Sequence, residues 1–191
     1  MLQTEREIDG RRSALIKLAG LCGLALSGDA LAALAAAGKA PAVPGLLSAE
    51  ALALTGVLAE HIIPATDTPG ALAVGAHRTI DRMLLACATE PEQQGFVAGL
   101  ARVDALVLAE AGKPFRALPA RQRVALLHAM DGGKAPFTAQ DQRFFRQLKS
   151  YTLFAYYTSE AGATRELAYL PVPGGFKGNF PVRKNTRTWA I

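Results

Sequence analysis

The sequence predicts an all-α protein: a single compact domain of about five helices, followed by an extended irregular tail and preceded by a targeting segment. Apolar residues recur at helical spacing, Pro and Gly separate these runs, and no run alternates with period two for long enough to form a strand. We therefore divide the chain into a signal segment (1–37), a helical domain (38–170) and a tail (171–191).

The first 37 residues have the layout of a twin-arginine export signal. Arg11 and Arg12 precede an apolar run, Ala14–Leu26, that only Lys17 interrupts, and small residues suited to a signal peptidase follow. The run is too short to span a bilayer. This layout predicts periplasmic localisation, with membrane contact only during transit. The alternative is an ordinary amphipathic N-terminal helix with an exposed arginine pair.

Five helices are expected in the domain, each ended by Pro, Gly or a polar turn. Their approximate ranges are 48–63, 74–88, 91–111, 119–130 and 139–159. Ser48 is suited to an N-cap, as is Thr138 with Asp141 three residues on. The third helix has the clearest apolar stripe, and Gly112 is its expected stop. The residues of that stripe are Phe96, Leu100, Val103 and Val107.

The last helix is apolar and aromatic nearly all round over Tyr151–Tyr157. This pattern predicts burial on several sides, either within the domain or by a partner. Cys87 falls at a helical core position, so we expect a buried small hydrophobe. The other cysteine, Cys22, lies in the signal segment, which leaves the mature domain with one thiol and no internal disulfide.

The basic charge is concentrated in the mature domain and its tail. The signal segment carries four basic and four acidic residues, so the formal net charge of +5 belongs to the rest of the chain. No acid follows Glu166, whereas Lys177, Arg183, Lys184 and Arg187 do. Export argues against nucleic acid as the partner of these cations. They indicate a solvated tail or a contact with an acidic partner.

Several kinds of site are excluded by their missing motifs. There is no C-x-x-C-H for covalent haem, no G-x-G-x-x-G after a strand, no G-x-S-x-G and no H-E-x-x-H. His61, His77 and His128 lack the spacing of metal ligands. We therefore expect no catalytic residue, no cofactor-binding residue and no metal ligand in this chain.

The loop Ala65–Gly70 is dense in turn-forming residues. The short acceptor side chains of Asp67 and Thr68 suit the free N–H groups of the next helix, so we expect Asp67→Ala to lower the melting temperature. His61 is expected to bond carbonyls at the end of the preceding helix. Glu160 is expected to act as a cap or to pair with Arg165.

Three segments carry a family resemblance, in the same order along the chain. They read H-I-I-P-A-T-D-T-P-G-A over 61–71, Y-T-S-E-A-G-A-T over 157–164, and Y-L-P-V-P-G over 169–174 with Gly178 beyond. With the twin-arginine leader, they resemble the gluconate 2-dehydrogenase subunit 3 family. Leu170 and the basic tail depart from its pattern, which leaves the subfamily and the partner open. The signature positions are His61, Pro64, Thr66, Asp67, Thr68, Pro69, Gly70, Glu160 and Gly162.

The resemblance implies a non-catalytic small subunit of a periplasmic sugar or polyol dehydrogenase complex, of the gluconate or glucoside type. In such complexes a large flavoprotein of the glucose-methanol-choline (GMC) type holds FAD and oxidises the substrate, and a multihaem cytochrome c often accepts the electrons. The small subunit would bind, stabilise and co-export the flavoprotein, which has no signal of its own. The competing hypothesis is a stand-alone periplasmic helical enzyme or metal-binding protein that uses His61, Asp67 and Glu160.

We expect the end of the last helix and the tail to form the surface that holds the larger subunit. A domain of this size buries few large rings, and exposed aromatic patches mark interfaces. The alternative is that the aromatic side chains fill the core and the tail wraps its own domain. The expected interface residues are Tyr156, Tyr157, Tyr169, Pro171, Pro173, Phe176, Phe180 and Trp189.

Overall fold

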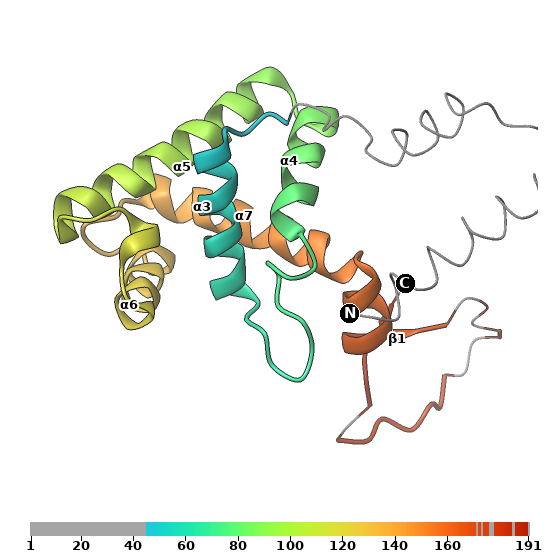
Figure 1. The fold of residues 1–191 in the computed structure, drawn as a ribbon. Helices are drawn as coiled ribbons and strands as arrows, with labels where there is room; N and C mark the ends of the chain where they lie inside the picture. The colour runs from blue at the N-terminus through green and yellow to red at the C-terminus, as the bar shows by residue number, and fades with distance from the viewer. Residues whose placement is uncertain (1–44, 171, 173, 176–177, 185, 191) are drawn as a thin grey trace, which may run out of the picture. The chain divides into compact units, whose positions relative to one another are not determined.

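A computed structural model of the chain describes residues 45–170, 172, 174–175, 178–184 and 186–190, all within one unit, Gly45–Ile191. The expected signal segment, with Arg11 and Arg12, lies outside the described residues. The predicted all-α class is confirmed (Figure 1). The elements are α3 (Ala49–Ile62), α4 (Ala76–Cys87), α5 (Glu90–Ala111), the 3-10 turn η1 (Phe115–Ala117), α6 (Ala120–Asp131), α7 (Ala139–Tyr157), the π-helical turn η2 (Gly162–Glu166), β1 (Ala168–Tyr169) and β2 (Trp189–Ala190).

Three helix ends lie at the capping residues that the sequence predicts. The Ser48 hydroxyl accepts a hydrogen bond from the Ala51 N–H at 3.2 Å and begins α3. Thr138 and Asp141 form a capping box at the start of α7. Gly112 ends α5 in the left-handed conformation, with φ of +67°, which a glycine adopts without strain. These three predictions are confirmed.

Helix α7 is the central element of the packing, because α3, α4, α5 and α6 all contact it. In Figure 1 it runs behind α3 and α4. Helix α5 buries the four residues of its predicted stripe, and most of its other residues are exposed. None of the described helices combines the length and the apolar character that a bilayer span requires. The largest fully buried side chains are Tyr156, Phe96, Phe115, Leu58, Ile80, Leu84, Leu100, Met130 and Leu148.

The expectation for Cys87 is wrong, since its side chain is exposed. Helix α4 ends at Cys87, and Leu84, one turn earlier, is its last buried residue. The apolar spacing therefore extends one turn beyond the layer in which the helix packs against its neighbours.

The tail returns to the helical domain through a pair of strands that the sequence does not reveal. Strands β1 and β2 are parallel, with Ala168 opposite Trp189, and the Ala168 N–H donates to the Thr188 carbonyl at 2.9 Å. Two-residue strands are too short to show an alternating pattern. Pro171, Pro173 and Phe176 lie outside the described residues.

Candidate partner-binding surface

The loop between α3 and α4 is organised by Glu60, a residue that sequence reasoning missed. Its carboxylate accepts hydrogen bonds from the backbone N–H groups of Ala65, at 3.2 Å, and Leu72, at 2.8 Å. The Ala71 N–H donates to the Ile63 carbonyl at 2.9 Å and closes the loop. A Cβ at Gly70 would collide with the Glu60 carboxylate and lie 2.7 Å from the Ala65 nitrogen. Gly70 therefore leaves room for the group that holds the loop.

Tyr156 joins this loop to the far end of the chain. Its hydroxyl donates to the Pro69 carbonyl at 2.9 Å and lies 3.3 Å from the Thr68 hydroxyl. Thr68 in turn donates to a Glu166 carboxylate oxygen at 3.0 Å. These bonds connect the first signature segment with the end of α7 and with η2.

The expected place of Tyr156 in the partner surface needs correction. The side chain is only 1% exposed and belongs to the core. Its ring is covered within its own domain, and its hydroxyl is used by the loop described above. Tyr156 therefore has no surface to offer to another protein.

The expected capping role of Asp67 and Thr68 is also wrong. Helix α4 begins after Gly75 and has no side-chain cap. The turn from Ala71 to Gly75 separates the loop from the helix, and the Ala76 N–H donates to the Ala71 carbonyl at 3.0 Å instead. The exposed Asp67 side chain contacts its neighbour, accepting a hydrogen bond from the Thr66 hydroxyl at 3.0 Å.

The second signature segment turns the chain sharply after α7. The Ser159 hydroxyl donates to the Tyr156 carbonyl at 2.6 Å and accepts from the Gly162 N–H at 3.1 Å. A Cβ at Gly162 would collide with the Tyr156 carbonyl oxygen, so a glycine fits there and a larger residue does not. The expected pairing of Glu160 with Arg165 is wrong, because neither residue takes part in an ion pair with any described residue.

The histidines occupy separate structural settings. His61 Nδ1 lies 2.9 Å from the Val57 carbonyl, one turn back in its own helix, and the ring meets Phe115 edge-on. The ring of His77 is half-buried, and this burial, with the nearby charge of Arg78, lowers the pKa of His77. Across the described residues, no three His, Cys, Asp or Glu side chains gather as metal ligands would.

The outward face of α7 ends in bare apolar side chains. Leu153, Phe154 and Tyr157 are exposed, Phe154 by 55%, while Thr152, Ala155 and Tyr156 on the opposite face are buried. Two turns earlier the same outward face carries the exposed cations Arg143 and Arg146. A helix of this kind is packed on one side and has an uncovered apolar patch on the other.

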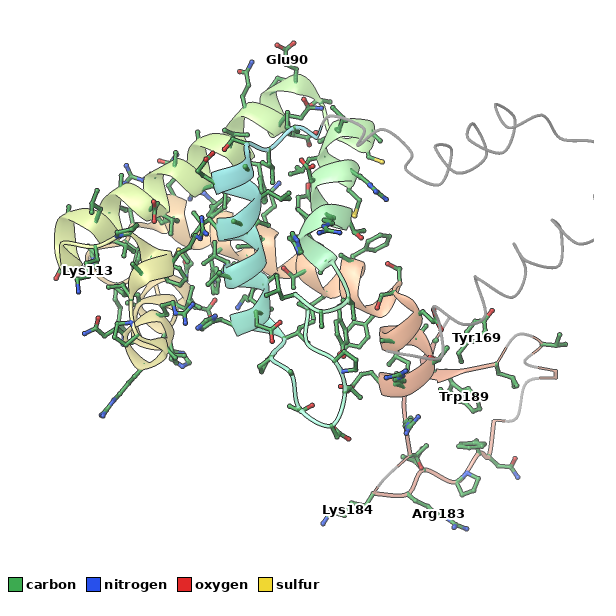
Figure 2. All side chains as sticks on the ribbon, in the orientation of Figure 1. Glu90, Lys113, Tyr169, Arg183, Lys184 and Trp189 are labelled. Atoms are coloured by element: carbon green, nitrogen blue, oxygen red, sulfur yellow. The ribbon has the colours of Figure 1, made fainter. Side chains whose placement is uncertain are left out.

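The tail adds a second group of exposed rings. Tyr169, Phe180 and Trp189 are each roughly half exposed, and the rings of Phe180 and Trp189 meet edge-on with centroids 5.9 Å apart. Figure 2 shows Tyr169 and Trp189 at the base of the C-terminal loop. We call these rings, together with Leu153, Phe154 and Tyr157, the aromatic surface. Groups of exposed apolar side chains of this kind mark sites of protein association.

A family model described as gluconate 2-dehydrogenase subunit 3 matches residues 49–174. The chain belongs to this family. The matched range runs from the start of α3 past β1 and includes both signature segments that Tyr156 connects. Members of the family are accessory subunits of gluconate 2-dehydrogenase complexes, which implies a larger partner. Searches among curated proteins and among solved structures find no significant match.

Proposed function

We propose that this chain is a non-catalytic small subunit that binds, stabilises and co-exports the large FAD-containing subunit of a periplasmic sugar dehydrogenase complex. The observation that carries the proposal is the uncovered apolar end of α7, formed by Leu153, Phe154 and Tyr157. Apolar side chains gathered on one face gain free energy when another protein removes them from water. The family supplies the kind of partner, a larger subunit of the same complex.

The polar side chains of the signature loop support a structural role. Glu60 holds backbone N–H groups, and Thr68 links Tyr156 to Glu166. These groups are already used in fixing the loop. In the proposed complex, a GMC-type flavoprotein holds FAD and oxidises the sugar, and a multihaem cytochrome c takes the electrons. This chain contributes a rigid surface to that assembly.

Export is tested by replacing the arginine pair. Arg11→Lys combined with Arg12→Lys should leave both the precursor and the flavoprotein in the cytoplasm, because the pair directly precedes the short apolar run. Flavoprotein content is measured in the cytoplasmic and periplasmic fractions. Arg6→Lys, which lies outside the pair, is the matched control and should not change the distribution. Normal arrival of both proteins in the double variant would refute co-export.

Binding is tested by removing the tail. Deletion of all residues after Leu170 takes away β2 with Phe180 and Trp189 and should release the flavoprotein, while circular dichroism shows that the chain stays helical. A complex that survives this deletion would show that the tail is not part of the interface. A purified chain with stoichiometric metal at His61, Asp67 and Glu160 would instead support the competing metal-binding hypothesis.

A further inference from the structure

The C-terminal loop carries exposed positive charges, whereas the side chains of the aromatic surface carry none. We infer that this loop, which we call the cationic loop and define by Arg183, Lys184 and Arg187, steers an acidic face of the large subunit toward this chain, while the apolar end of α7 holds it there. The inference rests on the proposed function and assigns a separate kinetic task to each part of the interface.

Hydrogen bonds among the described residues form a turn within the cationic loop. Its base is closed by the pairing of β1 with β2. Near its far bend the Arg183 N–H donates to the Thr186 hydroxyl at 2.7 Å, and the Thr186 N–H donates to the Arg183 carbonyl at 3.0 Å. Figure 2 shows the side chains of Arg183 and Lys184 at this bend, pointing outward from the loop. The turn therefore gathers the positive charges of Arg183 and Lys184 at one bend.

The charge of the loop is not neutralised within the described part of the chain. Arg183, Lys184 and Arg187 are exposed, and the two ion pairs among the described residues involve other groups, Arg102 with Asp141 and Lys149 with Asp131. No acidic residue follows Glu166. An uncompensated cluster of one sign accelerates the encounter with a surface of the opposite sign.

The apolar end of α7 is suited to holding the partner once it has bound. Leu153, Phe154 and Tyr157 carry no charge, so they exert no attraction at a distance. Once covered, such side chains exclude water, and truncation of well-packed contacts acts mainly on the dissociation rate. The exposed Arg143 and Arg146 lie on the same face of the helix and extend the positive field toward this patch.

The chemistry of the loop fits a protein with clustered carboxylates. The guanidinium groups of Arg183 and Arg187 match the planar geometry of carboxylates, and the hydrogen bonds between Arg183 and Thr186 bring the backbone of both arginines into one turn. A lipid surface offers mobile charges and gains less from the planar match between guanidinium and carboxylate groups. We therefore assign the loop to an acidic protein surface, with anionic lipid as the alternative outcome of the experiment.

The test measures association and dissociation rate constants between the exported chain and the FAD-loaded large subunit, at low and at high salt. Arg183→Glu, Lys184→Glu and Arg187→Glu together should lower the association rate constant at least tenfold at low salt and abolish most of its salt dependence, with dissociation changed less than about threefold. Leu153→Ser with Phe154→Ser should instead raise the dissociation rate at least tenfold and leave association nearly unchanged.

A matched control separates the loop from net charge alone. Lys113→Glu, Arg121→Glu and Lys134→Glu change the same number of exposed cations elsewhere on the domain and should alter association less than about threefold. An equal effect of both triple variants would overturn the inference. Normal association of the loop variant, combined with its failure to bind vesicles of phosphatidylcholine and phosphatidylglycerol that the unmodified chain binds, would assign the loop to lipid. Absence of any complex with the unmodified chain would overturn the proposed function as well.

Discussion

Glu60 and Asp67 lie seven positions apart, but only Glu60 makes contacts that should contribute much to stability. Glu60 accepts two backbone N–H groups across the loop, whereas Asp67 contacts its neighbour Thr66. We expect Glu60→Gln to lower the free energy of unfolding by about 1–2 kcal/mol, because a charged acceptor is lost. The measurement is urea unfolding, with the exposed Glu110→Gln as control. Equal stability of the two variants would contradict the role given to Glu60.

Asp67→Ala is expected to change the free energy of unfolding by less than about 0.5 kcal/mol, as surface substitutions usually do. This reverses the expectation from the sequence, in which Asp67 caps the next helix. The same unfolding experiment decides between the two. A fall of about 1 kcal/mol in the free energy of unfolding, the usual cost of a lost cap, would support the view that Asp67 caps the next helix.

Asp141 gives the domain a pH-dependent contribution to stability. Burial raises the pKa of this carboxyl group, but hydrogen bonds from Arg102 and Thr138 and the guanidinium charge outweigh burial and hold the pKa below its ordinary value. A carboxyl group with a lowered pKa in the fold stabilises above its unfolded pKa of about 3.9. That stabilisation is lost as the pH falls through the lower folded value.

Asp141→Asn should therefore lower the free energy of unfolding by about 2 kcal/mol at pH 7. This magnitude combines a lost cap with a weakened, partly exposed ion pair. The difference from the unmodified chain should shrink as the pH falls below about 4. Urea unfolding of both proteins at a series of pH values measures this difference in the free energy of unfolding. A difference that stays constant down to strongly acidic pH would contradict this account.

At the scale of elements, Tyr156 couples α7 to the loop after α3. Tyr156→Phe keeps the buried ring but removes the hydrogen bonds to Pro69 and Thr68. We expect a loss of about 1 kcal/mol and faster amide hydrogen exchange over residues 65–72. The control is Tyr157→Phe, whose side chain is exposed. Identical exchange in both variants would show that Tyr156 does not restrain the loop.

The elements differ in how well the sequence predicts them. Helix α5 follows its pattern, because the single stripe of Phe96, Leu100, Val103 and Val107 is the set of residues that it buries. The end of α7 is apolar or aromatic on nearly all sides, so periodicity alone could not tell the buried Tyr156 from the exposed Phe154 and Tyr157. Tertiary contacts decide which of these side chains is buried, and one of them is the hydrogen bond from Tyr156 to the Pro69 carbonyl, 87 positions away.

The same limit applies to the candidate surface. The sequence identified the aromatic residues of the tail, but the pairing of β1 with β2 depends on contacts between residues about 20 positions apart. Glu60 was missed because it is an ordinary polar residue on a helix, and its value comes from the backbone groups that the loop brings to it. Long-range geometry of this kind leaves no local signal in the sequence.

At the scale of the whole molecule, the described residues combine a packed helical core with an exposed apolar helix end and a basic loop that has no ion pair among them. The family was evident from the sequence because three segments occur in the right order, and the match over residues 49–174 confirms it. The structure then shows that the first two of these segments are held in the fold by hydrogen bonds to the adjacent Glu60 and Tyr156 and by the close approach at Gly162. The exposed apolar side chains of α7 lie at the start of the second segment, at Leu153, Phe154 and Tyr157.

The central claim is that this chain holds a larger flavoprotein through the end of α7. The most direct measurement is the flavin absorbance that copurifies with the tagged chain after coexpression with the large subunit. We expect the unmodified chain and Lys113→Glu to retain the flavoprotein, and Leu153→Asp with Phe154→Asp to lose it while circular dichroism remains helical. A chain that purifies alone, or a flavoprotein retained by the double variant, would contradict the claim.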